Sequence, residues 1–240
     1  MGHFDLLSKG KNPGGRKIPS KKIKNFEADK DAENLLLGFA DYGFPQYVYP
    51  AWEKMHAKKT FLSQETLERI STFISKCPEN ISNNLFKSLR IASIASNESE
   101  KDITKELLEL SYPYNFSDYM TESCNEFKMD PKIMYGIFRS ESFFSPEIKS
   151  NAGAIGIAQL MESTAADIAK RLKVENYDLT NPQTSIRFGT YYFNNLYTRL
   201  DSSLILAAFA YNSGITRVRK WVTTSKKELY TLPLHQFAFF

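Results

Sequence analysis

Apolar side chains recur at three- and four-residue spacing along most of this chain, and that pattern restricts the fold more than any other feature. Residues spaced in this way lie on one face of an α-helix, so each run predicts an amphipathic helix. Apolar–polar alternation, the pattern of a half-buried strand, is weak everywhere. The sequence therefore predicts a mainly α fold, with hairpins that suggest α-superhelix-like packing in the first half. The runs in that half are Leu35–Ala40, Leu67–Ile74, Leu85–Ala92 and Ile103–Leu110.

Turn and capping residues indicate where these helices begin and end. Gly43 and the pair Cys77-Pro78 follow helical runs and predict helix ends, whereas Ser63 predicts a helix start. Gly189 lies in an apolar seam, where a glycine allows a neighbouring element to approach closely. In the second half, helix starts are expected at Ser117, Asp130-Pro131, Ser163, Asn181-Pro182 and about Ser203, the last of these helices ending near Asn212.

Composition places the chain among ordinary soluble globular proteins, since 42% of its 240 residues are hydrophobic and 24% are charged. This length is enough for one large or two small domains, each with its own core. No window approaches the roughly 18 consecutive apolar residues of a transmembrane segment. Met1–Gly10 lacks the apolar segment of a secretory signal peptide.

The positive charge is concentrated near the N-terminus. The net charge is +4, and lysines and arginines crowd residues 1–30 between glycines and prolines. This composition predicts a flexible basic arm. Because aromatic residues do not alternate with the basic ones, we expect a solvated tail and no nucleic-acid partner.

The cysteines and histidines predict no metal site and no cofactor. Cys77 and Cys124 lack metal-ligand spacing, and the three histidines are scattered. Cys124 shares a helical face with Met120 and Phe127, which is typical of a small core residue.

Glu141 is the strongest candidate for chemistry, because it is a carboxylate on the apolar side of a predicted helix. It follows Met134, Ile137 and Phe138 at helical spacing, whereas Arg139 points to the opposite face. Burial disfavours the charged form of a carboxyl and raises its pKa, as a general acid near neutral pH requires. The alternative is a glutamate at a fraying helix end whose side chain bends out to water.

Three motifs follow one another in the second half and resemble those of the soluble lytic murein transglycosylase family. The motifs of that family are a glutamate-serine pair, a glycine-rich loop ending in methionine-glutamine, and an alanine-tyrosine-asparagine-x-glycine segment. The resemblance covers roughly Tyr112 to Trp221, about half of the chain. The matching segments here are Glu141-Ser142, Gly153–Met161, Ala210–Gly214 and Arg217–Trp221.

The resemblance implies a division of the chain into three parts. Residues 1–30 would be the basic arm, and residues 31–111 a helical segment like the end of an α-superhelical domain. Residues 112–240 would form a lysozyme-like α-helical catalytic domain with an atypical or truncated C-terminal end. The location implied is the cell envelope or periplasm. Without a signal peptide, export would use another route, or this start would lie inside a longer gene product.

The activity implied is cleavage of the β-1,4 bond between N-acetylmuramic acid and N-acetylglucosamine in peptidoglycan glycan strands. Glu141 would protonate the leaving oxygen, and the 2-acetamido group would stabilise the anomeric centre. The ionised glutamate would then take the proton of the 6-hydroxyl, which gives a 1,6-anhydro product. No second acid is apparent, since Glu147 and Glu162 are expected to be surface charges; a lone acid fits the substrate-assisted exceptions among glycosidases.

Matched positions imply supporting roles for five residues. Ser150 would lie close to the acid and the acetamido group, Gln159 would bind sugar hydroxyls, and Met161 would line the cleft. Tyr211 would orient the acid or flank the sugar, and Asn212 would bind the acetamido carbonyl. The structural alternatives are loop solvation for the serine, core packing for the methionine, and helix-end packing or capping for the tyrosine and asparagine.

The sequence also departs from the family pattern. Ala158 replaces a methionine and is expected to remove apolar bulk from the cleft, and Glu162 replaces a proline. Tyr230 and Gln236 occupy positions that are acidic in the family, and the closing helix of the family is absent. The apolar residues of the tail, Leu232, Leu234, Phe237, Phe239 and Phe240, would then lack a covering element.

Two other functions remain open from the sequence. One is a hydrolytic muramidase of the goose-type lysozyme sort, in which water replaces the 6-hydroxyl. The other is an inactive peptidoglycan-binding or helical scaffold protein, which the altered C-terminus favours. Exolytic and endolytic action both remain open.

Overall fold

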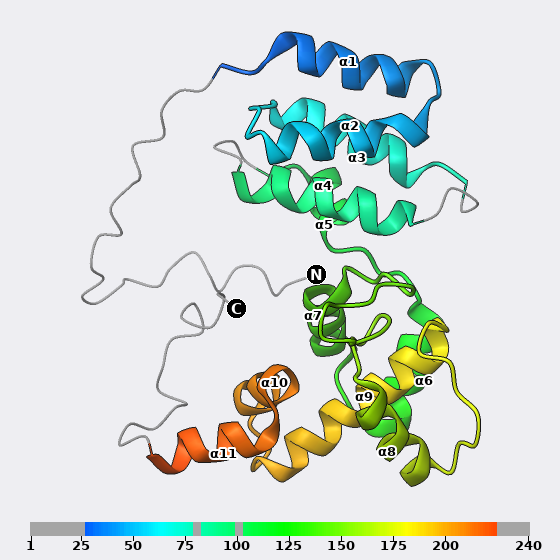
Figure 1. Ribbon diagram of the computed structural model, residues 1–240, viewed down its shortest axis with the longest axis vertical. Coiled ribbons are helices and arrows are strands. Elements are labelled where there is room, and N and C mark those ends of the chain that lie inside the picture. The colour runs from blue at the N-terminus through cyan, green and yellow to red at the C-terminus, as the bar shows by residue number, and fades with distance from the viewer. Residues whose placement is uncertain (1–26, 79–82, 99–102, 225–240) are drawn as a thin grey trace, which may run out of the picture.

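The computed structural model describes residues 27–78, 83–98 and 103–224, which form two groups of helices joined by the chain near Tyr112 (Figure 1). Most of the expected basic arm and the whole apolar tail lie outside these residues. The mainly α expectation is confirmed, and β pairing in the described ranges is limited to the isolated bridges Lys149–Ile155 and Ile155–Leu160. No helix within these ranges is long and apolar enough to cross a membrane.

The first group of helices packs around its own apolar core. Leu36, Trp52, Ile70, Ile91 and Leu107 are almost completely buried in it. Leu35 was expected on the same face as Leu36 but is half exposed, because it lies one helical step outside the buried stripe. The helices are α1 (Lys30–Asp41), α2 (Pro45–Ala57), α3 (Gln64–Ser75), α4 (Asn84–Glu98) and α5 (Lys105–Ser111).

Local signals explain most boundaries in this group. Ser63 caps α3 by accepting a hydrogen bond from the Thr66 N–H. Gly43 follows α1 with a φ of 75°, a left-handed conformation that glycine adopts without strain. The helix α2 begins after Phe44 without a side-chain cap, has Pro45 at its first position and contains Pro50.

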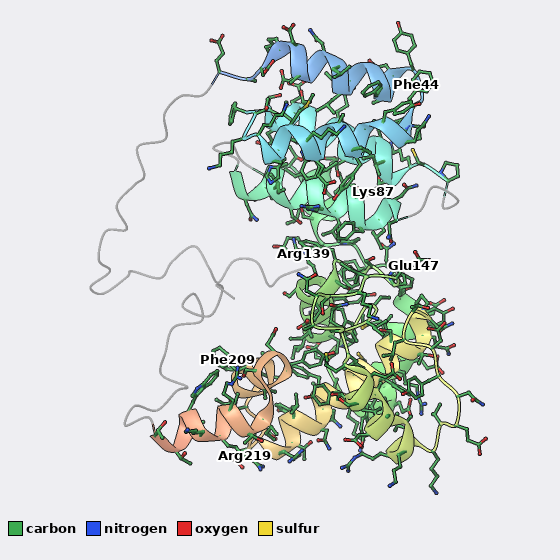
Figure 2. All side chains as sticks on the ribbon, viewed as in Figure 1. Phe44, Lys87, Arg139, Glu147, Phe209 and Arg219 are labelled. Atoms are coloured by element: carbon green, nitrogen blue, oxygen red, sulfur yellow. The ribbon has the colours of Figure 1, made fainter. Side chains whose placement is uncertain are left out.

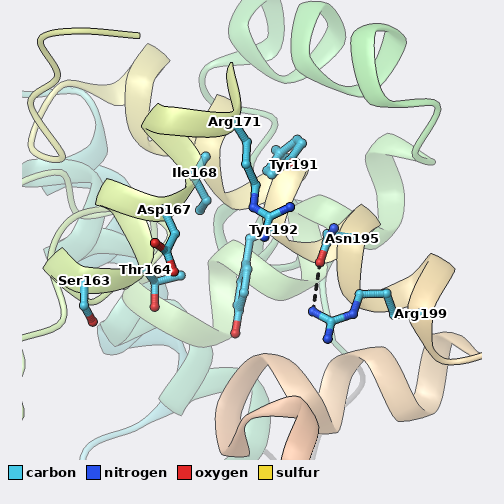
Figure 3. Close-up of a pocket in the computed structure, with 9 residues that line it drawn as sticks. All are labelled: Ser163, Thr164, Asp167, Ile168, Arg171, Tyr191, Tyr192, Asn195 and Arg199. Carbon is cyan, nitrogen blue, oxygen red and sulfur yellow. Dashed lines mark hydrogen bonds between the residues drawn. The ribbon is translucent and has the colours of Figure 1, made fainter. Parts of the chain in front are cut away.

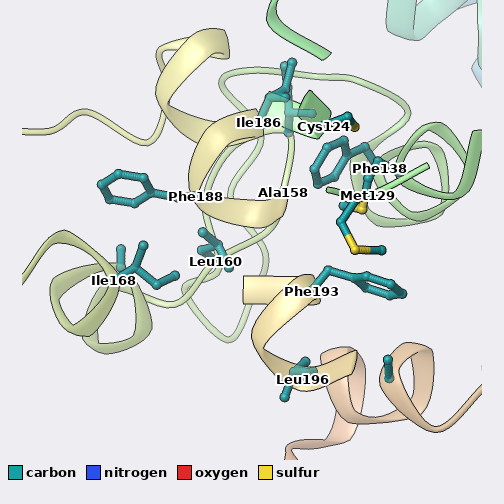
Figure 4. Packing of buried hydrophobic residues seen from close by; sticks show 14 of the residues in the cluster. Cys124, Met129, Phe138, Ala158, Leu160, Ile168, Ile186, Phe188, Phe193 and Leu196 are labelled. Carbon is teal, nitrogen blue, oxygen red and sulfur yellow. The ribbon is translucent and has the colours of Figure 1, made fainter. Parts of the chain in front are cut away.

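The second group of helices packs around a larger core. Figure 4 shows Phe138 of α7, Phe188, Phe193 and Leu196 of α9, and Ala158 of the loop among the buried side chains of this core. The helices are α6 (Ser117–Phe127), α7 (Pro131–Ser142), α8 (Glu162–Leu172), α9 (Pro182–Arg199), α10 (Leu204–Ser213) and α11 (Ile215–Thr224).

The helix starts expected at Ser117 and Ser163 agree with the structure to within one residue, but neither serine caps its helix. Ser117 lies inside α6, because Phe116 starts the helix in a left-handed conformation and no side chain caps it. Ser163 lies in the first turn of α8, because the Ala165 N–H already bonds to the Met161 carbonyl. The Asp130-Pro131 and Asn181-Pro182 starts are confirmed, since both cap side chains accept backbone N–H groups.

Gly189 brings α9 against α7, as its place in the apolar seam predicted. A Cβ atom at Gly189 would lie 2.5 Å from the Ala158 Cβ and 2.7 Å from the Phe138 Cε1. These distances are too short for any other residue, so the glycine sets how closely α9 approaches the helix that carries Glu141.

The helix α11 was not expected from the sequence. Gly214, with a φ of 82°, separates it from α10, and Val218 anchors it in the core. The expected end near Asn212 therefore marks a bend between two helices and not the last helix of the described chain.

Candidate active site

The Glu141 carboxyl lies in the last turn of α7 and is half-buried. Burial raises its pKa from the ordinary 4.5 to about 7, although a hydrogen bond from the Asn212 side chain acts in the opposite direction. The C-terminal end of a helix also disfavours negative charge. Glu141 is therefore available both as a proton donor and as a proton acceptor near neutral pH.

Ser142 connects the end of this helix to the glycine-rich loop. Its buried hydroxyl lies 2.8 Å from the Ile157 carbonyl and 3.3 Å from the Phe138 carbonyl. Phe143 and Phe144 then adopt positive φ values of 50° and 58°, which end α7. The residue after the acid thus holds the loop against the helix that carries it.

The loop before α8 is held in shape by its own polar groups. Gln159, with a φ of 46°, donates its side-chain amide to the carbonyls of Ile148 and Gly156, at 3.3 and 2.9 Å. Ser150 accepts a hydrogen bond from the Ala154 N–H at 3.0 Å. A Cβ at Gly156 would lie 2.0 Å from the Leu179 carbonyl oxygen, so only glycine fits there.

Tyr211 and Asn212 approach the acid from α10. The Tyr211 hydroxyl donates to the Ala158 carbonyl at 2.8 Å, and its ring lies 5.2 Å from Tyr192 and 6.2 Å from Phe193. Burial, followed by the nearby Glu141 and Tyr192, raises the pKa of Tyr211 well above its usual range. The structure therefore brings the end of α7, the loop and the end of α10 together around one carboxyl.

Met161 and Ala158 were also expected to affect the cleft, and they differ in exposure to solvent. Met161 is 42% exposed at the start of α8, so its side chain is available to a ligand. The expectation that Ala158 opens the cleft is wrong, since Ala158 is fully buried against Gly189.

Two residues of the site were missed in the sequence. The Ser185 hydroxyl, fully buried in α9, accepts from the Ala158 N–H at 3.1 Å, so both backbone groups of Ala158 are held by side chains. Ser185 lies one turn before Gly189 on the apolar seam, and a polar residue there is a signal that could have been noticed.

Arg139 is the second missed residue and holds the other side of α7. Its guanidinium donates to the Ser111 carbonyl at 2.7 Å and to the Ser93 hydroxyl at 2.8 Å. It also lies 4.3 Å from the centre of the Tyr112 ring. Figure 2 shows Arg139 at the junction of the two groups of helices. Burial lowers its pKa. The first group thus contacts α7 two residues before Glu141.

No second carboxylate of the described ranges contributes to the pKa shift of Glu141. Glu147 is exposed, and the exposed Glu162 accepts a hydrogen bond from the Tyr177 hydroxyl at 2.7 Å. Both are surface charges, as expected. No group of three metal-ligating side chains was found in the part of the chain that the structure describes.

Comparisons with known proteins agree on one family. The family model of the transglycosylase SLT domain matches residues 118–232. The soluble lytic murein transglycosylase of Salmonella typhimurium is 33% identical over 122 residues, which are 49% of this chain and 19% of that protein. The Escherichia coli protein of the same name is 31% identical over equal shares. The matched part of this chain thus spans about a fifth of the length of these relatives.

A solved structure extends the likeness to the first group of helices. It is that of an inactive mutant, with glutamine in place of a glutamate, of the lytic transglycosylase Slt from Pseudomonas aeruginosa. The TM-score is 0.63 at 20% identity, over 85% of this chain and 33% of that one. A match of this extent reaches beyond residues 118–232, so the likeness in fold includes helices that precede α6.

Proposed function

Because residues 118–232 belong to the transglycosylase SLT domain family, we propose that this protein is a lytic transglycosylase that acts on peptidoglycan. It cleaves the β-1,4 bond between N-acetylmuramic acid and N-acetylglucosamine and leaves a 1,6-anhydro end on the muramic acid. The protein then acts at the cell envelope, where this polymer lies.

The observation that carries the proposal is the desolvated carboxyl of Glu141. With a pKa of about 7, Glu141 is substantially protonated near neutral pH and donates its proton to the glycosidic oxygen. The ionised form then accepts the proton of the 6-hydroxyl as that oxygen attacks the anomeric carbon. The carboxyl returns to its starting state, so one residue serves both steps.

The absence of a second carboxylate at Glu141, among the described residues, favours substrate assistance. Most glycosidases place a second acid roughly 5–9.5 Å from the first. Here the acetamido group of the substrate itself stabilises the positive charge that develops at the anomeric carbon. Water is not required as a nucleophile, because the 6-hydroxyl takes its place.

The surrounding side chains have supporting roles in this proposal. Asn212 orients the Glu141 carboxyl and is exposed enough to bind the acetamido carbonyl. Tyr211 fixes the end of α10 through Ala158, and Met161 offers an apolar surface to a sugar ring.

The two loop residues keep part of their hydrogen-bonding capacity for the substrate. Gln159 uses its amide nitrogen within the loop, which leaves its amide oxygen to accept from a sugar hydroxyl. Ser150 accepts within the loop, and its hydroxyl proton remains available to donate to the acetamido group.

Mass spectrometry of purified peptidoglycan after digestion tests the proposal. Anhydro ends are expected, and they are lighter by one water than the reducing ends that hydrolysis produces. Reducing ends would instead identify a muramidase. Sedimentation of the protein with insoluble wall, without release of fragments, would identify a binding protein.

A further inference from the structure

A pocket of about 230 Å³ lies between α8 and α9, and Tyr192 forms part of its lining (Figure 3). Its lining is mostly polar and combines tyrosine rings, small hydroxyl groups and charged side chains. Residues of α8 and α9 face each other across it: Ser163, Thr164, Asp167, Ile168 and Arg171 from α8, and Tyr191, Tyr192, Asn195 and Arg199 from α9.

The charged groups of this pocket have few partners within the protein. In Figure 3 the Arg171 side chain extends from α8 toward Tyr192. Arg171 and Asp167 have no hydrogen bond or ion pair with any described residue, and the Arg199 guanidinium donates one hydrogen bond within the described residues, to the Asn195 side chain at 3.4 Å. Two guanidinium groups and one carboxylate thus face the pocket, and their net charge is positive.

Tyr192 connects this pocket with the acid. Its ring lies 5.2 Å from Tyr211, and Tyr211 lies close enough to Glu141 for that carboxyl to raise its pKa. Ser163 and Thr164 follow the exposed Met161 by two and three residues. The pocket therefore adjoins the exposed Met161 at the start of α8, and Tyr192 and Tyr211 lie between it and Glu141.

We propose that this pocket binds the carboxylate of a peptide attached to the glycan strand. The inference rests on the proposed function, because it identifies which part of peptidoglycan lies next to the reacting bond. The hydroxyl groups of a sugar do not require two arginines, whereas a guanidinium pairs with a carboxylate through two parallel hydrogen bonds. Asp167 suits an ammonium group on the same peptide.

Two substrates that differ only in the peptides test the proposal. Glycan strands are prepared from one wall sample, with their peptides either retained or removed by an amidase. For Arg171→Gln, KM is expected to rise about five- to tenfold on peptide-bearing strands and to stay unchanged on stripped strands. Arg199→Gln is expected to act in the same direction. An equal effect on both substrates, or on neither, would overturn the proposal.

The neighbouring Lys170 supplies a matched control. It is exposed on α8 and does not line the pocket, so Lys170→Gln removes the same charge at a distance from it. This variant is expected to behave as the unmodified protein on both substrates. Arg171→Lys keeps the charge but loses the paired geometry, and it is expected to lie between Arg171→Gln and the unmodified protein.

A binding measurement separates this proposal from the proposed function. In a Glu141→Gln background, the affinity for peptide-bearing strands is expected to fall when Arg171→Gln is added, and the affinity for stripped strands is not. If the unmodified protein forms no anhydro product but this difference holds, the pocket is supported and the lyase function is wrong. If anhydro product forms and affinity ignores the peptides, the pocket proposal is wrong and the function stands.

Discussion

Two buried glutamates, one in each group of helices, have opposite pKa shifts. Burial acts first on both and raises the pKa of each. Glu33 in α1 then accepts hydrogen bonds from the Ser63 N–H, the Thr66 hydroxyl and Lys30, which bring its pKa down to about 2. Among the described residues, Asn212 alone donates to Glu141, which keeps a pKa of about 7.

The difference shows that burial alone does not keep a carboxyl protonated near neutral pH. At Glu33, three donors hold the carboxylate charged, and it joins α1 to the start of α3. At Glu141, the protein supplies burial without enough donors to stabilise the charge, so the proton remains until about pH 7. The same residue type is structural in one group of helices and chemically available in the other.

The largest effect expected from this comparison is the loss of activity in Glu141→Gln. The amide keeps the shape of the side chain but neither delivers nor regains a proton, so the rate should fall at least ~10²-fold. Stability should be unchanged or raised, because a neutral amide replaces a desolvated carboxyl. Release of anhydro fragments and thermal unfolding measure the two effects. A variant that keeps half of the wall-lysing rate would exclude Glu141 as the acid.

The pH dependence of the rate sharpens the comparison. Since the pKa of Glu141 is about 7, the protonated fraction falls about tenfold for each pH unit well above that value. The rate is therefore expected to decline on the alkaline side. A rate that rises steadily through pH 8 would contradict the role of Glu141 as the proton donor.

Arg139→Met would break the contact between the two groups of helices. It removes the hydrogen bonds to Ser93 and Ser111 while it keeps apolar contact with the ring of Tyr112. Buried hydrogen bonds from a charged group suggest a loss of roughly 1.5–3 kcal/mol in the free energy of unfolding. Denaturant unfolding measures this loss, with Lys132→Met, exposed on the same helix, as the control. Equal stability of the two variants would mean that the junction does not support α7.

The sequence predicted the fold class and the helix that carries the acid because both depend on local patterns. Helical spacing marked most of the helices, and the Asp130-Pro131 pair marked the start of α7. The helix α2 was missed, although Pro45 stands at its first position, because Phe44 offers no side-chain cap and Pro50 lies inside the helix. The start of α6 depends on a left-handed Phe116, which no propensity favours.

The site was partly predictable for the same reason. Glu141 could be proposed as a candidate from its place on an apolar stripe, and Tyr211 with Asn212 from a motif. The roles of Ser185 and Arg139 depend on partners that are distant in sequence, since Arg139 reaches Ser93, 46 residues earlier. Such contacts exist only after the two groups of helices have packed.

Glu33→Gln tests the structural member of the pair. The Ser63 N–H and the Thr66 hydroxyl both donate to Oε1, which the amide oxygen can replace, whereas the amide nitrogen then takes the place of Oε2 and leaves Lys30 without its charged acceptor. The expected loss is roughly 1–3 kcal/mol in the free energy of unfolding, without a change of the residues around Glu141. Glu65→Gln, exposed in the first turn of α3, is the control. A loss of similar size in both variants would show that the burial of Glu33 has no special effect.

The smallest effect expected is a difference in how stability depends on pH. Since the pKa of Glu33 is lower in the folded protein, its contribution is present above about pH 4.5 and is lost as the pH falls toward 2. The pKa of Glu141 is higher in the folded protein, so its contribution is present below about pH 4.5 and is lost as the pH rises through 7. Melting temperatures from pH 3 to pH 8 should therefore decline less on the acid side in Glu33→Gln and less on the alkaline side in Glu141→Gln. If the two variants followed the unmodified protein in parallel at all pH values, the opposite shifts of the two glutamates would be refuted.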